Sequence, residues 1–386
     1  MPTVINGLTW DHPRAVDPLD AANAVLAARR PDLLVNWDKQ PLAGFEARPL
    51  GEIVERYDLV IFDHPHVGEA ARKRLLRPVD GLCRALGLED ADFAGRSLDS
   101  YRYDGALWGL PIDAACQVSC FRPDLLDLLG EWPPSSWDMV LALGERARMS
   151  GLWLAAGLGG VHALMMLLTL CANQDAPLAR SPGPAFPDRS AALRALGAMR
   201  APVALCPPEV LSWSSIALQD AMRARNDLVF CPAVFGFSTY SRPVPTQPPL
   251  RYGNLPGLDG SGPRGSTLGG AGIGISALSR APEVAEEIVA LLVSPELQAG
   301  AMAAAGGQPA HRAAWSSPAV DVAADGFNSR TCETMEAAWV RPRFPGYLGF
   351  QRAGGPLVEA CLRGADPQRT LDRLDDAWSA AWRSGE

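Results

Sequence analysis

Short apolar runs alternate with stretches of mixed polarity over the first 62 residues of the chain. The apolar runs are rich in β-branched and aromatic side chains, as buried strands are. Between the first two runs, Asp17 is a suitable N-cap and Pro18 a suitable first residue for a helix. Alternating strands and helices predict a parallel sheet with right-handed crossovers and the strand order 2-1-3. The pattern predicts strands at 4–10, 33–37 and 58–62, and helices at 18–30 and 50–57.

Two copies of one tripeptide, Asp11-His12-Pro13 and Asp63-His64-Pro65, follow the first and third predicted strands. In the order 2-1-3 these strands are neighbours, and ligands of such sheets bind outside the carboxyl ends of the strands at this point. The sequence therefore predicts that His12 and His64 face one crevice.

The rest of the chain repeats the alternation of strands and helices. Segment 151–172 is long enough to span a membrane, but Gly157, Gly159 and Gly160 interrupt it and His162 would be buried in lipid, so a strand, a glycine loop and a buried helix are favoured. The pattern predicts strands at 114–121, 152–156, 228–230 and 268–275, helices after Ser135 or Ser136, at 161–171, from Ser279 to Leu292 and from Ser294 to about Gly306, and loops at 176–187 and 243–265.

Length and charge limit the classes of function. A chain of 386 residues is too long for one ordinary core, so two lobes are expected. A net charge of -8 argues against nucleic acid or an anionic membrane as the partner, and no segment is expected to insert into a membrane.

Eight cysteines are scattered along the chain without Cys-x-x-Cys spacing, which argues against zinc and thioredoxin-like sites. Unpaired thiols suit a reducing compartment, and the first residues lack the features of an export signal. The sequence therefore predicts a cytoplasmic protein. Removal of a signal and a periplasmic location are the alternative.

Five motifs occur together in the order of a known family: Trp108–Pro111, Cys120–Leu126, Pro133–Asp138, Gly269–Ile275 and Ser294–Gln298. With them the chain resembles the extracellular solute-binding proteins of the maltose-binding type over nearly its whole length. The resemblance implies an α/β fold of two lobes, each a doubly wound, mostly parallel sheet flanked by helices, joined by a hinge that closes over a ligand. Residues 1–112 with 268–312 would form the N-terminal lobe, and residues 113–267 with 313–386 the C-terminal lobe.

Candidate ligand residues of the first lobe gather at the predicted edge. Trp10, His12 and Arg14 precede a helix whose amide-rich start attracts anions, and Asp63 and His64 occupy the matching loop. The alternatives are that Asp11 and Arg14 satisfy the loop backbone and each other, and that His64 makes a structural hydrogen bond.

The remaining candidates lie at the chain crossings and in the other lobe. Asp113 at the first crossing serves as a ligand contact or a hinge residue, and Gly269 and Gly270 allow close backbone approach at the second. Phe237 and Tyr240 offer flat apolar faces to a ligand or belong to the core. Gln308 and His311 are weaker candidates.

Other chemistry has weaker support. The Asp-His loops could hold a metal for hydrolysis, but no His-x-x-x-His or Glu-x-x-His spacing is present. No serine lies in a Gly-x-Ser-x-Gly elbow either.

Together these observations predict a non-enzymatic, monomeric binding protein without a cofactor. It would capture a small polar or anionic molecule by hinge closure, with an organic acid or a coenzyme A thioester as suggested ligands. The alternatives are a conventional substrate-binding protein for a sugar or amine, with an ABC-transporter permease as its partner if it is exported, and a metal-dependent hydrolase.

Overall fold

The computed structural model describes residues 2–260 and 262–385, apart from the side chains of residues 43, 46 and 47. Contacts divide the chain into two compact units, which we call unit 1 and unit 2. Unit 1 runs to Ala115 and also contains Gly269–Ala324 and Arg343–Gly346, and unit 2 contains Cys116–Leu268, Asp325–Pro342 and the chain from Tyr347 onward. The first two boundaries, predicted at 112/113 and 267/268, lie at 115/116 and 268/269 in the structure. The third, predicted at 312/313, lies at 324/325.

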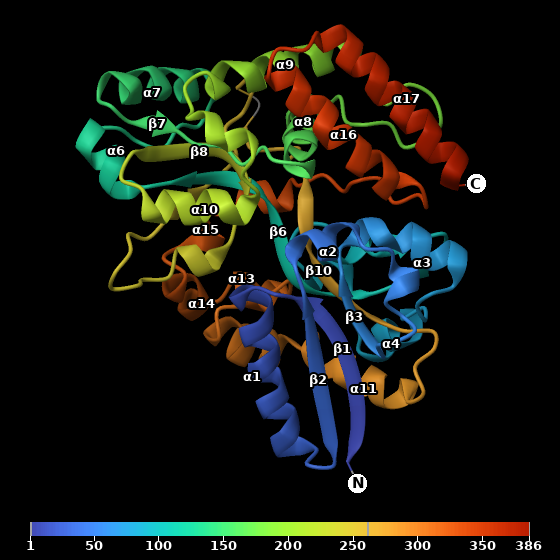
Figure 1. The fold of residues 1–386 in the computed structure, drawn as a ribbon. Helices are drawn as coiled ribbons and strands as arrows, with labels where there is room; N and C mark the ends of the chain where they lie inside the picture. Colours follow the sequence, from blue (N-terminus) through green and yellow to red (C-terminus); the bar gives the residue numbers. More distant parts are fainter. Residues whose placement is uncertain (1, 261, 386) are drawn as a thin grey trace. The chain divides into compact units, whose positions relative to one another are not determined.

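Three parallel strands form the sheet of unit 1 in the order β2-β1-β3, which confirms the predicted order (Figure 1). Strand β1 (Thr3–Trp10) lies between β2 (Leu33–Gln40) and β3 (Leu59–Phe62), and β10 (Leu268–Ile275) pairs with β3 in the antiparallel direction. Leu8 is opposite Val60 in the register. The loops that follow β1 and β3 therefore leave the same edge of the sheet.

Helix α1 (Pro13–Arg29) packs against β1 and β2. It begins at Pro13 and not at Pro18, because His12 caps it. The predicted helix at 50–57 is wrong: a single 3-10 turn at Leu50–Glu52 is followed by turns. Unit 1 also contains helices α2 (Leu42–Ala47), α3 (Val67–Lys73), α4 (Asp80–Ala85), α5 (Ser97–Ser100), α11 (Pro282–Leu292), α12 (Pro295–Leu297), α13 (Arg312–Trp315) and α14 (Pro318–Ala323), 3-10 turns at His64–His66 and Asp90–Asp92, and a hairpin of β4 (Arg102–Tyr103) and β5 (Ala106–Leu107).

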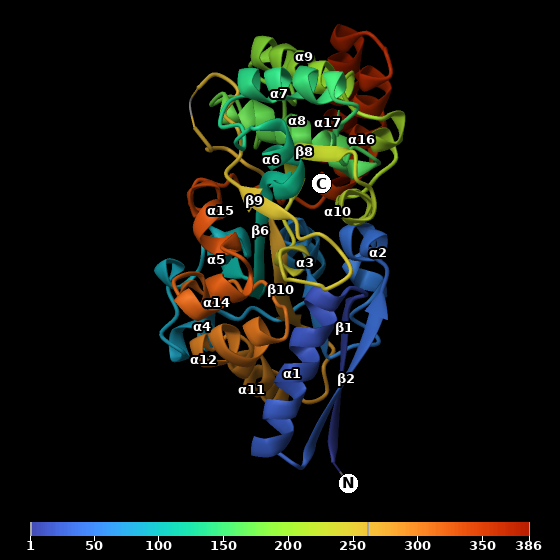
Figure 2. The ribbon, with the colours of Figure 1, turned by 90° about the vertical axis from the view of Figure 1, so that its left-hand side faces the viewer.

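Strand β6 (Leu110–Phe121) carries the chain from unit 1 into unit 2. There it pairs in the antiparallel direction with β8 (Leu228–Phe235) and with β9 (Arg251–Gly253), while β7 (Trp153–Leu154) runs parallel to β8. Helix α15 (Phe327–Glu336) packs against β9 (Figure 2). The α/β class is confirmed, and the sheet of unit 2 has mixed strand directions.

Helix α8 (Val161–Asn173) forms the centre of unit 2, since every residue from His162 to Asn173 is buried. It packs against α9 (Arg189–Val203) and α16 (Tyr347–Leu362). Within the described residues, no helix combines the length and the apolar content that a membrane span needs. The remaining helices of unit 2 are α6 (Pro123–Leu129), α7 (Trp137–Met149), α10 (Ser215–Ala224) and α17 (Pro367–Gly385), with 3-10 turns at Pro208–Leu211 and Ser238–Tyr240.

Candidate functional site

His12 fixes the start of α1. Its backbone is extended, and its Nδ1 accepts a hydrogen bond from the backbone N–H of Arg14 at 3.1 Å. Pro13 occupies the first helical position, where the missing N–H costs nothing because that N–H would have no partner in the helix. The Asp-His-Pro motif is therefore a helix cap here, and the cap places Arg14 in the first turn.

The side chains of Arg14 and Asp113 form a buried ion pair. Arg14 Nε donates to Asp113 Oδ2 at 2.8 Å, and Arg14 Nη2 donates to Asp113 Oδ1 at 2.5 Å. The side chains are 3% and 12% exposed. Burial raises the pKa of Asp113, while the charge and hydrogen bonds of Arg14 act in the opposite direction. This two-point geometry is the strongest form of such a pair, so Arg14 already has an internal anion.

Trp10 lies beneath His12. The two rings stack with 5.3 Å between centroids and 16° between planes, and Phe45 lies on Trp10 at 5.7 Å. Trp10 is buried, whereas His12 is partly exposed. Of these two predicted ligand residues, His12 is therefore the one that a solute can reach.

The second Asp-His loop is packed more deeply. His64 Nδ1 lies 3.1 Å from Asp63 Oδ1, and its ring meets the Tyr101 ring edge-on at 6.3 Å. His64 is only 1% exposed. The negative charge of Asp63 raises the pKa of Asp113, so Asp63 belongs to the same electrostatic cluster as the Arg14–Asp113 pair. His64 stays a predicted ligand residue, but its ring lies against Tyr101.

Gly270 and Gln308 hold the segment around Asp113. Gly270 has φ 113°, and a Cβ there would lie 2.4 Å from the carbonyl oxygen of Asp113, so only glycine fits. Gln308 Nε2 donates to the carbonyl oxygen of Ala114 at 2.8 Å, and the N–H of Ala114 donates to the carbonyl oxygen of Gln308 at 3.0 Å. Gln308, a weaker candidate from the sequence, thus has a clear positioning role. Gly269 is half-buried beside Gly270.

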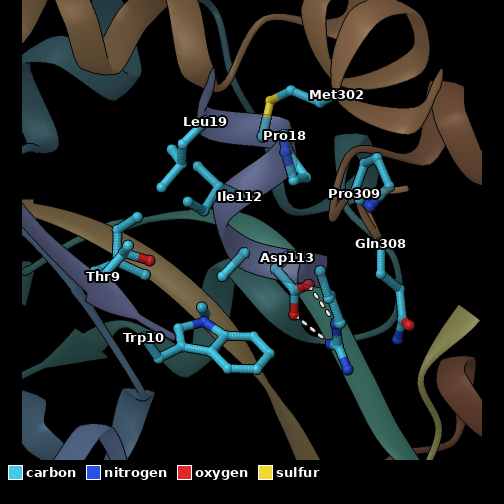
Figure 3. A pocket seen from close by; sticks show the side chains of 14 residues that line it. Thr9, Trp10, Pro18, Leu19, Ile112, Asp113, Met302, Gln308 and Pro309 are labelled. Atoms are coloured by element: carbon cyan, nitrogen blue, oxygen red, sulfur yellow. Dashed lines mark hydrogen bonds and ion pairs between the residues drawn. The ribbon is translucent and has the colours of Figure 1, made fainter. Parts of the chain in front are cut away.

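A small cavity of about 20 Å³ lies next to the ion pair. Trp10, Asp113, Met302 and Gln308 are among the residues that line it (Figure 3). Thr9 Oγ1 also lines it, is buried, and has no hydrogen-bond partner in the described part of the chain. The cavity has room for one water molecule and not for a solute, so a solute would contact the exposed side of His12 and Asp113.

The predicted aromatic contacts Phe237 and Tyr240 are packed inside unit 2. Their rings lie 6.2 Å apart, and both side chains are buried. The hydroxyl of Tyr240 donates to Asp220 Oδ1 at 2.7 Å, and Arg223 lies over the Tyr240 ring at 5.1 Å. Asp220 and Arg223 both belong to unit 2, and a ligand contact of Tyr240 stays a prediction.

The described residues contain no group of three or more His, Cys, Asp or Glu side chains that could hold a metal ion. The neighbouring Asp and His residues of the two loops do not converge as a donor set, because His12 caps a helix and His64 faces Tyr101. The geometry gives no support to the hydrolase alternative.

Protonation of the partly buried His12 and of the buried His162 should make the protein less stable in mild acid. Burial, assisted by the charge of Arg14, lowers the pKa of His12 to about 4, and burial alone lowers the pKa of His162 to about 4. An unfolded histidine titrates near 6.5, so between pH 6.5 and 4 the unfolded chain takes up more protons than the folded one. For the fully buried His162 this costs up to about 3 kcal/mol by pH 4.

The measurement is urea unfolding between pH 7.5 and 4.5, in which the free energy of unfolding should fall as the pH falls. His12→Asn keeps a good helix cap and removes the ring, so this variant should show a shallower fall. An identical pH dependence in both proteins would contradict the lowered pKa of His12.

Two comparisons with known proteins, by family and by sequence, give no match. No protein-family model matches the chain, and no curated protein does.

Solved structures do match the chain over nearly its whole length. A maltose-bound protein of T. maritima, MalE3, superposes with a TM-score of 0.83 at 18% identity, covering 97% of this chain and 98% of that one. The GacH receptor of Streptomyces glaucescens, solved without ligand and with acarbose, gives 0.82 at 16% identity and 99% of both chains. An ABC transporter solute-binding protein of Agrobacterium radiobacter in complex with ribitol gives 0.77 at 20% identity, covering 98% of this chain and 100% of that one.

At this level of identity the similarity shows the fold. The chain has the α/β fold of the ABC transporter solute-binding proteins, which the order of its sequence motifs predicted.

Proposed function

We propose that this chain is a non-enzymatic solute-binding protein whose ligand is a small neutral molecule with several hydroxyl groups, such as a sugar or a polyol. The observation that carries the proposal is the buried Arg14–Asp113 pair at the carboxyl end of the sheet in unit 1. A neutral pair of this kind offers both donors and acceptors to hydroxyl groups.

The local charge argues against an anionic ligand. The positive charge of Arg14 is balanced by Asp113 at hydrogen-bonding distance, and the lowered pKa of His12 leaves its ring uncharged near pH 7. Asp63 adds a negative charge close enough to act on Asp113. An organic acid or a coenzyme A thioester would compete with Asp113 for Arg14 and would be repelled by the carboxylate of Asp113, which disfavours binding.

The comparisons support the same ligand class. Proteins of this fold were solved with maltose, with acarbose and with ribitol. The sugar alternative from the sequence is therefore preferred here over the organic acid that the sequence first suggested.

A thermal-shift panel tests the proposal. Maltose, ribitol, mannitol and tagatose form the neutral set, with succinate, citrate and acetyl-coenzyme A as the anionic set and spermidine as an amine. A ligand that binds only the folded state raises the melting temperature, so we expect a rise of several degrees with at least one neutral compound. A rise with the anionic set alone would contradict the proposed ligand class.

His12→Asn is the binding variant for this panel, because it keeps a helix cap and removes the partly exposed ring. We expect it to bind the neutral compound at least about tenfold more weakly, a loss of roughly 1.4 kcal/mol. His311→Asn is the matched control, since His311 caps α13 in the same way, with Nδ1 accepting from the N–H of Ala313 at 3.1 Å, but packs against Phe93. Equal weakening in both variants would remove His12 from the site.

Hinge closure over the ligand and a permease partner stay predictions of the family resemblance. A solute-binding protein that closes should become more compact with its ligand, as measured by small-angle X-ray scattering. An unchanged radius of gyration at saturating ligand would count against closure.

We propose a reducing compartment for the protein, with the cytoplasm as the location. Seven of its eight cysteines are buried as thiols, and burial raises the pKa of Cys116 and of Cys231 to about 12. Eight thiols should therefore be titrated in protein taken from its native host, unfolded under non-reducing conditions, and the buried ones should react slowly in the folded state. Fewer than eight thiols, or a mature terminus left by signal cleavage, would contradict the proposed compartment.

A further inference from the structure

Unit 2 carries an open pocket of about 360 Å³ that the proposed function does not use. Its lining residues belong to the end of β6, to α6 and the loop after it, to β9 and to α15; Figure 2 labels α6, β9 and α15. Phe121, Leu126, Pro133 and Tyr252 provide apolar lining. We call this feature the α6–β9 pocket. Its volume lies within the range of pockets that hold a large side chain or a small molecule.

Trp132, at the rim of this pocket, has an unusually exposed side chain. It lines the pocket and is 82% exposed, the highest value among the large hydrophobic residues that the structure describes as exposed. Leu128, on the last turn of α6, is 73% exposed. A single exposed apolar residue needs no explanation, but a tryptophan next to an apolar hollow is the combination found at binding hot spots.

Charges of opposite sign lie on the two sides of the pocket. Asp127 and Glu131 lie on the α6 side, and Arg251 and Arg330 lie on the β9 and α15 side. Glu131 pairs with Arg146, and both arginines pair with Asp325. With these partners counted, the α6 side keeps the negative charge of Asp127, and the opposite side keeps one positive charge.

We propose that a second copy of this chain docks at the α6–β9 pocket about a twofold axis, with Trp132 of each copy seated in the pocket of the other. A twofold interface joins the same patch on both copies, so the patch must be complementary to itself. This patch holds both the protruding ring and the hollow that can receive it. The twofold rotation also brings the Asp127 side of one copy against the Arg251 and Arg330 side of the other, so the charges match.

None of the residues that line the pocket is among the predicted ligand residues, so the proposed docking does not depend on the solute site. The sequence predicted a monomer. Because the proposed contact is confined to this pocket and its rim, we expect a weak dimer whose formation depends on concentration.

Sedimentation equilibrium of the full chain between 5 and 500 μM tests the proposal. The wild-type protein should shift from monomer to dimer within this range, and Trp132→Ala should raise the dimer dissociation constant at least tenfold. Met149→Ala is the matched control, since Met149 is 81% exposed in the same unit but does not line the pocket. A wild-type monomer at 500 μM, or equal dimerisation of Trp132→Ala, would overturn the proposal.

A charge exchange tests the geometry of the interface. Asp127→Lys places two positive charges opposite each other at each contact, and Arg330→Glu places two negative ones, so each variant alone should dimerise at least tenfold more weakly than the wild type. In an equimolar mixture each contact again joins opposite charges, so the two variants should form a heterodimer with wild-type strength. A mixture that stays as monomeric as the separate variants would overturn the twofold arrangement.

Discussion

Replacement of Arg14 by methionine should destabilise the folded protein by about 3–5 kcal/mol, the usual cost of leaving one partner of a buried ion pair without its countercharge. The carboxylate of Asp113 would then be held next to Asp63 without the guanidinium that now donates two hydrogen bonds to it. Asp113→Leu should cost a similar amount, because it leaves the charge of Arg14 buried. Urea unfolding at pH 7 measures both changes.

The double variant Arg14→Met with Asp113→Leu separates the pair from its surroundings. Exchange of both charges for apolar groups is often nearly neutral, so the double variant should be more stable than either single variant. It should still lose solute binding. Arg30→Met is the control, because Arg30 pairs with Asp32 on the surface and should change stability little. If the double variant lost as much free energy of unfolding as the two single variants together, the two charges would not act on each other.

Substitution of Gly270 by alanine should cost at least about 3 kcal/mol. A non-glycine residue at φ 113° is strained by about 1–3 kcal/mol, and its Cβ would lie 2.4 Å from the carbonyl oxygen of Asp113, so the backbone of β6 must move as well. Because that movement displaces the Asp113 carboxylate, solute affinity should fall together with stability.

Gly197→Ala is the matched control for this substitution. Gly197 lies in the interior of α9, and a Cβ there would meet no atom within 4 Å. Alanine favours a helix over glycine by roughly 0.5–1 kcal/mol, so the control should be as stable as the wild type or more so. A Gly270→Ala protein that unfolds like this control would contradict the close approach of β10 to Asp113.

Local sequence patterns predicted the sheet of unit 1 because few topologies are open to alternating strands and helices. The order β2-β1-β3 follows from that rule, and it placed the two Asp-His-Pro loops at one edge. The start of α1 was missed because histidine is an uncommon cap, although Pro13 directly after it was a usable signal.

The predicted helix at 50–57 shows how a correct burial pattern can give a wrong element. Leu50, Ile53, Val54 and Tyr57 are all buried, at the spacing of a helix face. The backbone nevertheless forms one 3-10 turn and further turns. Apolar spacing over so short a segment reports burial and does not fix the backbone.

The partner of Arg14 could not be predicted. Asp113 is 99 residues away in the sequence, and only the fold brings the two side chains together. The sequence alone therefore indicates an external anion as the partner of Arg14. The α6–β9 pocket could not be predicted for the same reason, since its lining comes from three separate segments of the chain.

The preference for a neutral ligand can be measured by calorimetric titration of the wild-type protein with matched pairs of ligands, one neutral and one acidic. Maltitol is compared with maltobionate and ribitol with ribonate, so that within each pair a carboxylate replaces one hydroxymethyl group. The neutral member of at least one pair should bind, and its acid should bind at least tenfold more weakly. An acid that binds as tightly as its neutral partner, or more tightly, would contradict this preference.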